Sequence, residues 1–246
     1  MGALVEKLSF RYVKCTYDEK TSHLKFIVRE EINVSQIKTY NVPVRHLHIN
    51  DAWPTLLMCH GNGEDIGGDN YLEELSKKFN TNICMFDYSG YGLHTCRTAS
   101  EDGTRKDVVA VYNYLLYMGI NPEKIIIYGR SIGTGVACYL AYHIRHDRQR
   151  PQKLILVSPL YSAVKVVTNI ELPFDSFRNY AMAPSITCST LILHGNNDWV
   201  ISHTCGKELS EKFPHLYKFH TLNNIGHNNI YTEEYYREIN KFIQTY

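Results

Sequence analysis

The chain of 246 residues carries 44% apolar and 21% charged side chains and a formal net charge of +1. This length can bury a substantial hydrophobic core, and this composition excludes disordered and fibrous proteins. Lysine and arginine are scattered among aspartate and glutamate, so the sequence lacks the basic stripe that a nucleic-acid-binding protein requires.

The apolar runs, the N-terminal sequence and the cysteines indicate the cellular compartment of the protein. No stretch approaches the roughly 18 to 20 apolar residues that a membrane-spanning helix needs, and the N-terminal MGALVEKLSFRYVKC lacks the apolar core of a signal peptide. The cysteines form no CxxC pair, and Cys59, Cys84 and Cys138 lie in apolar runs, where a free thiol packs as a small hydrophobic group. We therefore expect a cytoplasmic protein with reduced cysteines and no metal site.

The first fifty residues differ from the rest of the chain. Residues 24–49, LKFIVREEINVSQIKTYNVPVRHLHI, alternate between apolar and polar side chains. This pattern predicts antiparallel strands at the edge of a sheet.

From residue 55 onward, short apolar runs alternate with segments of helical period, which indicates βα units and a mainly parallel sheet. Strands are expected at 55–61, 82–90, 124–129, 153–159, 190–195 and 216–222. Helices are expected at 69–79, 104–118, 132–146, 203–212 and 232–243. The chain has no internal repeat, low-complexity tract or linker, so we expect residues 1–246 to form one α/β domain.

The second of these helices has recognisable ends. Thr98 and Glu101 have the spacing of a capping box, which predicts the helix start. Gly119 and the following Pro122 predict its end.

The sequence KIIIYGRSIGTGVA, residues 124–137, places Ser131 where an expected strand turns into an expected helix. A bare GxSxG motif is weak evidence, but this strand and helix are the setting of a nucleophile elbow. Gly129 and Gly133 remove side chains from the tight turn, and Gly133 and Gly135 would let the helix pack close to the sheet. We interpret Ser131 as a nucleophile; the alternative is that the glycines serve packing alone.

A nucleophilic serine also needs N–H donors for the oxyanion. The N–H of Ile132 lies at the start of the expected helix and suits this role. The glycine-rich HGNGED loop offers a second donor, for which we choose Asn62. His60 in this loop could be a base, but its place at a strand end favours a loop-fixing role.

The serine further needs a base, and the base needs an acid to orient it. Asp198 follows a buried run in LILHGNNDWVI, whereas the strand at 153–159 is followed by SPLYS, which has no carboxylate. His227 lies in a polar loop after the last expected strand. The alternatives are a turn-capping aspartate and a solvent-exposed loop histidine. Ser131, Asp198 and His227 follow in the order nucleophile, acid, base, which is the order in the α/β-hydrolase fold.

The motifs CHGNGED, FDYSGYG, IIIYGRSIGTG, LILHGNND and GHNNI resemble those of α/β-hydrolase domain-containing proteins of the seventeenth group and their bem46-like relatives. The resemblance implies an α/β-hydrolase fold, with a mainly parallel twisted sheet, helices on both faces and minimal or no cap domain. It implies that Ser131, Asp198 and His227 form a charge-relay triad that works without a cofactor. It also implies a serine hydrolase that removes palmitate from cysteines of membrane-attached proteins, in peripheral contact with membranes.

Two departures from the family concern the substrate and the membrane. The family usually carries glutamine before the nucleophile, where this chain has Arg130, a cation that we expect to alter the accepted acyl or protein substrate. The palmitoylated N-terminal cysteine cluster of the family has no counterpart in MGALVEKLSFRYVKC.

The segment between the strands at 153–159 and 190–195 has about thirty residues, enough for a helix and a loop but not for a separate cap domain. An open site of this kind suits a bulky acylated protein. Apolar residues of the segment are either core residues or the lining of an acyl groove: Val164, Val166, Val167, Leu172, Phe174 and Phe177.

Three functions are compatible with these residues, because one fold hosts many reactions. The first is an acyl-protein thioesterase or a general carboxylesterase acting on small acyl esters. The second is a serine peptidase of the same fold, and the third is a non-catalytic binding protein.

Overall fold

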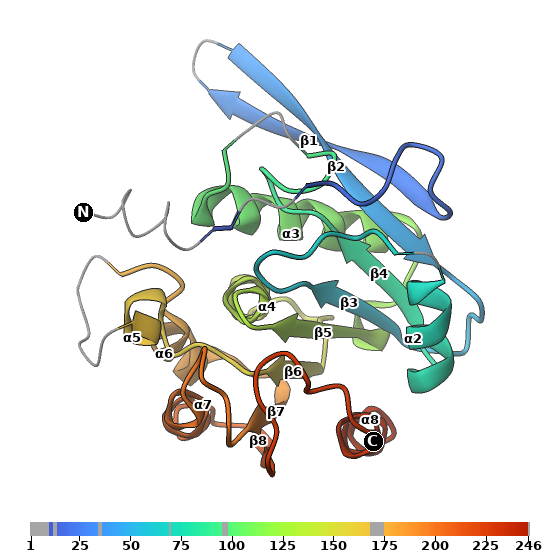
Figure 1. The fold of residues 1–246 in the computed structure, drawn as a ribbon. Coiled ribbons are helices and arrows are strands. Elements are labelled where there is room, and N and C mark those ends of the chain that lie inside the picture. Colours follow the sequence, from blue (N-terminus) through green and yellow to red (C-terminus); the bar gives the residue numbers. More distant parts are fainter. Residues whose placement is uncertain are drawn as a thin grey trace.

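The computed structural model describes residues 10–11, 14–33, 36–68, 70–94, 98–167 and 175–245. Within them, an eight-stranded sheet has the order β1-β2-β4-β3-β5-β6-β7-β8 (Figure 1). The strands are β1 (Leu24–Asn33), β2 (Gln36–Leu47), β3 (Thr55–Cys59), β4 (Asn82–Phe86), β5 (Ile125–Arg130), β6 (Lys153–Val157), β7 (Ser189–Gly195) and β8 (Leu216–Leu222).

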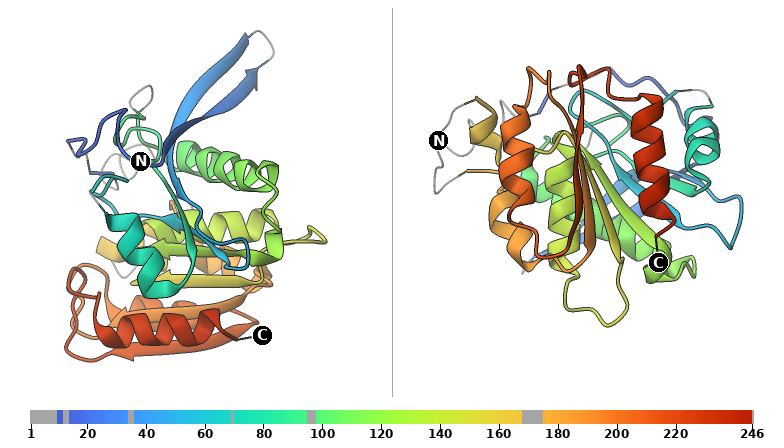
Figure 2. Two further views of the ribbon diagram at one scale, coloured as in Figure 1. Left: turned by 90° about the vertical axis from the view of Figure 1, so that its right-hand side faces the viewer. Right: turned by 90° about the horizontal axis from the view of Figure 1, so that it is seen from below.

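The sheet is parallel from β4 to β8 and antiparallel at its N-terminal edge. Residues 42–47 of β2 are buried, and the end of the strand pairs with β4. The rest of β2 pairs with β1 in a hairpin that projects from the sheet (Figure 2). The antiparallel edge predicted from the first fifty residues is therefore confirmed.

Helices cover both faces of the sheet (Figure 2). One face is covered by α2 (Tyr71–Phe79) and α8 (Glu233–Ile243), and the other by α3 (Glu101–Tyr117), α4 (Gly133–His143) and α7 (His203–Ser210). Two short helices, α5 (Ala163–Val167) and α6 (Asn179–Met182), lie in the segment between β6 and β7. The predicted α/β class is confirmed.

The central strands pack against both helical layers. Leu57 and Ile127 belong to the hydrophobic cluster that contains residues of α3 and α4, whereas Leu56 and Ile126 belong to the cluster that contains residues of α2 and α8. Successive side chains of a strand point to opposite faces, so a strand buried on both faces reads as an unbroken apolar run. Burying each such side chain contributes about 1.5–3 kcal/mol.

The predicted start of α3 is wrong in its detail. The N-cap is Ser100, whose side chain accepts the N–H of Gly103, and its extended backbone (φ −154°, ψ 156°) is that of an N-cap residue. Glu101 is the first helical residue, and its carboxylate accepts the N–H of Phe177 at 2.7 Å instead of closing a capping box. The predicted end is right, because Gly119 leaves the helix with φ +80°.

The strand expected at 82–90 ends at Phe86, because the chain turns to reach a buried carboxylate on α3. Asp107 accepts the N–H and hydroxyl of Ser89 at 2.7 and 2.8 Å. The same carboxylate lies 3.2 Å from His94 Nε2 and 3.2 Å from Arg29 Nε. All of these side chains are buried, and Asp107 satisfies both polar groups of Ser89 in the DYSGYG turn.

Replacing Asp107 with alanine should destabilise the fold. The change removes the buried carboxylate that Arg29, His94 and Ser89 share, and removing one partner of a buried charged network typically costs about 3–5 kcal/mol. Urea unfolding followed by circular dichroism measures this loss. Asp147→Ala, at an exposed aspartate, is the matched control; equal stability of the two variants would contradict the role of Asp107.

Candidate active site

Ser131 lies in a strained turn between β5 and α4. Its φ is +53°, a left-handed value that non-glycine residues seldom adopt. The turn is held by the Ser131 N–H, which donates to the Val157 carbonyl at 2.9 Å, and by the Thr134 N–H, which donates to the Ser131 carbonyl at 3.0 Å. Strain of this kind is typical of functional residues whose surroundings fix them.

Two glycines make this turn possible. A Cβ atom at Gly129 would lie 2.5 Å from the carbonyl oxygen of Gly133, and one at Gly133 would lie 2.2 Å from the carbonyl oxygen of Cys59. Both distances are too short for a side chain. Gly135 differs from the prediction, because a Cβ there would meet Phe177 at 2.3 Å; the close neighbour is this side chain and not the sheet.

The structure brings the three predicted residues into one hydrogen-bonded chain. His227 Nε2 lies 3.0 Å from Ser131 Oγ, and His227 Nδ1 lies 2.7 Å from Asp198 Oδ2. The carboxylate can only accept a hydrogen bond, so Nδ1 carries the proton and Nε2 is free to accept the serine proton. The residues come from the loops after β5, β7 and β8, as predicted.

Further hydrogen bonds keep Asp198 ionised. Its Oδ1 accepts the N–H groups of Val200 and Ile201 at 2.9 and 2.8 Å. Burial raises the pKa of Asp198, but hydrogen bonds from His194, His227 and the Ile201 N–H outweigh burial and hold the pKa well below its ordinary value. A carboxylate in this state can stabilise a protonated His227.

His194 is a residue of the site that the sequence analysis missed. It is fully buried, and its Nε2 lies 3.0 Å from the Ile201 carbonyl and 3.3 Å from Asp198 Oδ2. Both neighbours are acceptors, so Nε2 carries the proton, and it contacts the same carboxylate oxygen, Oδ2, as His227 Nδ1 does. The available signal was a histidine inside the apolar strand run, four residues before the predicted acid.

The loops that carry Asp198 and His227 are held against each other. The Asn197 N–H donates to the Ile225 carbonyl at 3.0 Å, and the Asn224 N–H donates to the Asn196 side chain at 2.7 Å. A Cβ atom at Gly195 would lie 2.2 Å from the Ile225 carbonyl oxygen. The spacing of acid and base therefore depends on a glycine at the end of β7.

Replacing Gly195 with alanine should displace the His227 loop. The new methyl group would clash with backbone, and a shift of about 1 Å at a catalytic group can reduce turnover about 100-fold. Kinetics with an activated ester, together with a thermal melt, measure the effect. Gly119→Asn is a control for loss of a glycine, since nothing lies within 4 Å of that position and asparagine tolerates its φ of +80°; unchanged turnover in Gly195→Ala would show that the loop tolerates the methyl group.

The two predicted oxyanion donors lie on the expected elements. Ile132 is the N-cap of α4, and none of the described residues accepts its N–H. Asn62 lies in the loop after β3, where its side-chain oxygen accepts the Arg11 N–H and the Tyr91 hydroxyl, both at 2.7 Å. These contacts fix the position of the Asn62 side chain in the loop.

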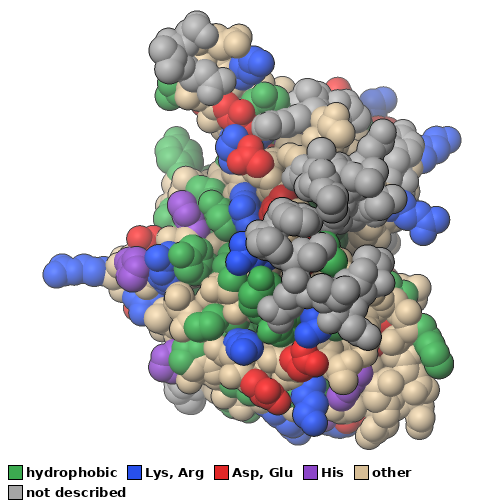
Figure 3. All heavy atoms as spheres, turned by 90° about the vertical axis from the view of Figure 1, so that its left-hand side faces the viewer, with side chains coloured by type: hydrophobic (Ala, Val, Ile, Leu, Met, Phe, Trp, Pro, Cys, Tyr) green, Lys and Arg blue, Asp and Glu red, His purple; other side chains and the backbone are tan. Residues whose placement is uncertain are grey.

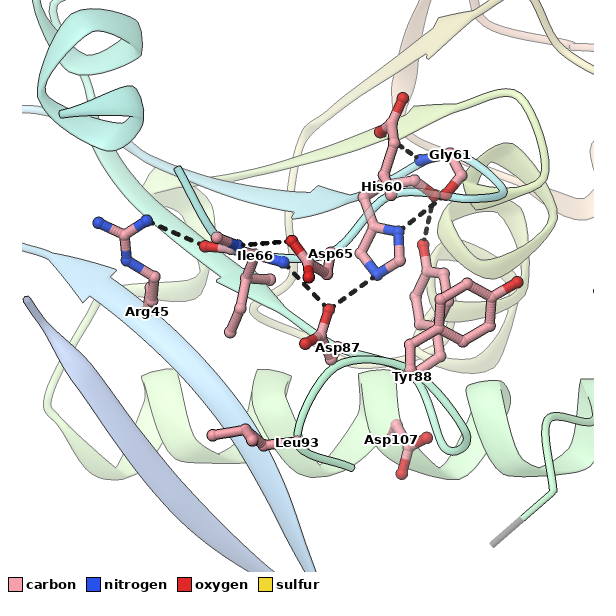
Figure 4. A network of polar contacts seen from close by, with 12 residues as sticks. Arg45, His60, Gly61, Asp65, Ile66, Asp87, Tyr88, Leu93 and Asp107 are labelled. Atoms are coloured by element: carbon pink, nitrogen blue, oxygen red, sulfur yellow. Dashed lines mark hydrogen bonds and ion pairs between the residues drawn. The ribbon is translucent and has the colours of Figure 1, made fainter. Parts of the chain in front are cut away.

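A buried pair below the loop fixes its conformation (Figure 4). His60 Nδ1 lies 2.9 Å from the Gly61 carbonyl and Nε2 lies 3.3 Å from Asp87, which also accepts the Ile66 N–H at 3.1 Å. Burial lowers the pKa of His60, but the hydrogen bond and charge of Asp87 outweigh burial and raise the pKa above its ordinary value. His60 thus contacts the loop and not Ser131, in line with the expected loop-fixing role.

The His60–Asp87 pair should make stability depend on pH. A folded pKa above the unfolded value of 6.5 gives stability that is complete below pH 6.5 and is lost as the pH rises through the folded pKa. The difference in unfolding free energy between the wild type and His60→Gln should therefore shrink from pH 6 to pH 9, measured by urea titration. His146→Gln, at an exposed histidine, should show no such trend; a difference that grows with pH would refute the charged pair.

Arg130, the residue before the nucleophile, is buried between two loops. Only 6% of the residue is exposed, and its guanidinium donates to Glu64, to the His227 carbonyl at 3.1 Å and to Asn228 Oδ1 at 3.3 Å. A side chain with these partners points into the protein between two loops. The expectation that Arg130 alters the accepted substrate stays a prediction, and its contacts are with the loops after β3 and β8.

The candidate groove residues that the structure describes are packed residues. Phe177 and Val164 are 1% and 5% exposed, and Val166 packs against the hydrophobic core. Phe177 lies against Gly135 of α4, so it serves the core and not an acyl groove. The Val167 side chain, Leu172 and Phe174 lie outside the described residues.

Two negative findings apply to the described ranges alone. Their histidine, cysteine, aspartate and glutamate side chains form no group of three that could hold a metal ion. Their helices include none that is long and apolar enough to span a membrane.

The mainly parallel sheet and the serine in a left-handed turn before α4 are those of an α/β-hydrolase. A family model described as alpha/beta hydrolase fold matches residues 58–209. The chain therefore belongs to the α/β-hydrolase fold family.

Comparison with curated proteins confirms the resemblance to the seventeenth group. Alpha/beta hydrolase domain-containing protein 17C of Xenopus laevis is 34% identical over 195 residues, which cover 77% of this chain and 61% of that protein. Alpha/beta hydrolase domain-containing protein aho-3 of Caenorhabditis elegans is 34% identical over 189 residues, which cover 75% of this chain and 55% of that protein. The chain thus matches between half and two thirds of these relatives' length.

Similarity to a solved structure supports the fold of the chain but not a substrate. The esterase RhEst1 from Rhodococcus is 18% identical and superposes with a TM-score of 0.67 over 91% of this chain and 99% of that one. Agreement at this identity shows that the architecture is shared, and substrates do not follow from it.

Proposed function

We propose that the protein is a serine hydrolase that cleaves acyl thioesters or esters through an acyl-enzyme. The observation that carries the proposal is the continuous chain from Ser131 Oγ through His227 to Asp198, with contacts of 3.0 and 2.7 Å. A serine hydroxyl is a weak nucleophile at neutral pH unless a base lies within hydrogen-bond reach and a third group orients that base.

In the first half-reaction, Ser131 Oγ attacks the acyl carbonyl carbon and its proton passes to His227 Nε2. The ionised Asp198 stabilises the imidazolium. As the carbon–sulfur or carbon–oxygen bond breaks, His227 returns the proton to the leaving thiol or alcohol, and the acyl group stays on Ser131.

In the second half-reaction, water takes the place of the leaving group. His227 accepts a proton from the water as it attacks the acyl-enzyme, and then protonates Ser131 Oγ as the acid departs. The N–H groups of Ile132 and Asn62 bind the oxyanion in both halves; Ile132 is supported by its place at the N-terminus of α4.

The finer proposal is that the substrate is an S-palmitoylated protein. It rests on the resemblance to the seventeenth group, whose members match this chain at 34% identity. A general carboxylesterase is the alternative that the same contacts of Ser131, His227 and Asp198 allow, because one fold hosts many reactions. A non-catalytic binding protein is less well supported, because the contacts of Ser131, His227 and Asp198 are complete. A serine peptidase would use the same contacts, and cleavage of an amide distinguishes it.

The proposed setting is a reducing, cytoplasmic compartment with peripheral contact to membranes. The described cysteines are all free thiols: Cys15, Cys59, Cys84, Cys138, Cys188 and Cys205. Burial raises the pKa of Cys84 and of Cys138, so these thiols stay protonated and unreactive in the core.

Hydrolysis of one substrate panel tests the proposal: short and long acyl esters, a palmitoyl thioester peptide and a peptide amide. Thioester turnover that increases with acyl length and is lost in Ser131→Ala is expected, because the variant has no nucleophile. Thr134→Ser, which keeps the hydroxyl that donates to the Ser131 carbonyl, is a control for disturbance of the turn.

The other outcomes assign the alternatives. Activity confined to short esters would make the protein a general esterase, and cleavage of the amide would make it a peptidase. Absence of turnover on every member of the panel would remove the catalytic proposal.

A further inference from the structure

The guanidinium of Arg130 lies between the two loops on which the proposed chemistry depends. Nη1 donates to Glu64 in the loop after β3, and Nη2 donates to the His227 carbonyl at 3.1 Å. The second of these acceptors belongs to the proposed base itself. Nη2 also reaches Asn228 Oδ1 at 3.3 Å, so it has two acceptors in the same loop.

Glu64 extends the connection into the backbone of the oxyanion loop. Its Oε1 accepts from Arg130, and its Oε2 accepts the Gly61 N–H at 2.8 Å. A Cβ atom at Gly61 would lie 2.7 Å from Arg130 Nη1, so the loop needs a glycine there to let the guanidinium pass. The ion pair therefore joins backbone groups of two loops that no strand pairing connects.

The geometry requires an arginine. Its planar fork offers N–H groups that diverge toward separate acceptors, whereas lysine offers one compact ammonium and glutamine offers no charge. The guanidinium also lies over the Tyr231 ring at 5.6 Å, a favourable contact for a cation. A cation that is 6% exposed costs free energy unless it is paired, and Glu64 supplies the pairing charge.

We infer that Arg130 is a positioning residue: with Glu64 it forms a strap that holds the His227 loop and the oxyanion loop in place around Ser131. The kinetic part of this inference rests on the proposed function. Because the strap touches the backbone of the base and not the substrate, its loss should reduce the rate of the chemical step and leave substrate binding and acyl preference unchanged.

The first test is a kinetic comparison of wild type, Arg130→Gln and Arg130→Lys on short and long acyl esters. We expect kcat to fall about 10- to 100-fold in Arg130→Gln with KM within about threefold, as for a misplaced catalytic group. The kcat of Arg130→Lys should lie between the values of the wild type and Arg130→Gln, because lysine keeps the charge that pairs with Glu64. Lys218→Gln, which breaks the remote pair with Glu238 on α8, is the matched control.

Two kinetic outcomes would overturn the inference. A kcat within twofold of wild type in Arg130→Gln would show that the strap does not position the base. A changed ratio of kcat/KM between short and long esters would make Arg130 a specificity residue. The kcat of the double variant Arg130→Gln/Glu64→Gln should be no lower than that of Arg130→Gln alone, because the two side chains act as one unit.

The second test does not depend on activity. Hydrogen–deuterium exchange should increase at residues 61–66 and 224–230 in Arg130→Gln, and stay unchanged elsewhere and in Lys218→Gln. If exchange in both loops of Arg130→Gln equals that of the wild type, the strap is contradicted even if kcat falls. If the wild type hydrolyses nothing, the proposed function fails, and exchange still decides whether Arg130 connects the loops.

Discussion

The site depends on how closely α4 approaches the ends of β3 and β5. Where other residues carry a side chain, Gly133 faces the Cys59 carbonyl and Gly129 faces the Gly133 carbonyl, so the helix begins directly over the strand ends. Ser131 has a positive φ in this turn, which continues directly into α4, and the N-cap Ile132 carries the N–H that we propose for the oxyanion. The cost of the left-handed serine is offset by the buried apolar packing of α4 against both strands.

Around this fixed serine, the other groups come from loops that must be held by their own contacts. Close approach at Gly195 sets the distance between the acid and base loops, and the His60–Asp87 pair supports the loop after β3 from below (Figure 4). His60 and Asp87 are buried, so each needs a hydrogen-bond partner. Seen from one side, apolar and charged side chains are mixed over the surface (Figure 3), in keeping with the near-neutral charge of the chain.

Sequence patterns predicted the parts of this arrangement that are local. Strands buried on both faces, the serine turn, and the order of Ser131, Asp198 and His227 all follow from short stretches of chain. The contacts between distant loops were not predictable in the same way, because Arg130 and Glu64 are 66 positions apart. A signal existed, since an arginine at the end of an apolar run needs a buried carboxylate, but the sequence alone does not say which one. The N-cap of α3 is a second example: Thr98 and Ser100 both carry a hydroxyl that can cap the helix, and the sequence alone does not say which one does.

The strand order also fixes when the site can be completed during synthesis. β8 is the edge strand, and the proposed base follows it, whereas the serine and the acid follow interior strands. A nascent chain that has folded as far as β7 therefore holds a serine with no base beside it, and such a hydroxyl is a weak nucleophile. Under the proposed function, Ser131 therefore gains its base only once β8 has paired and the loop that follows it lies beside the serine.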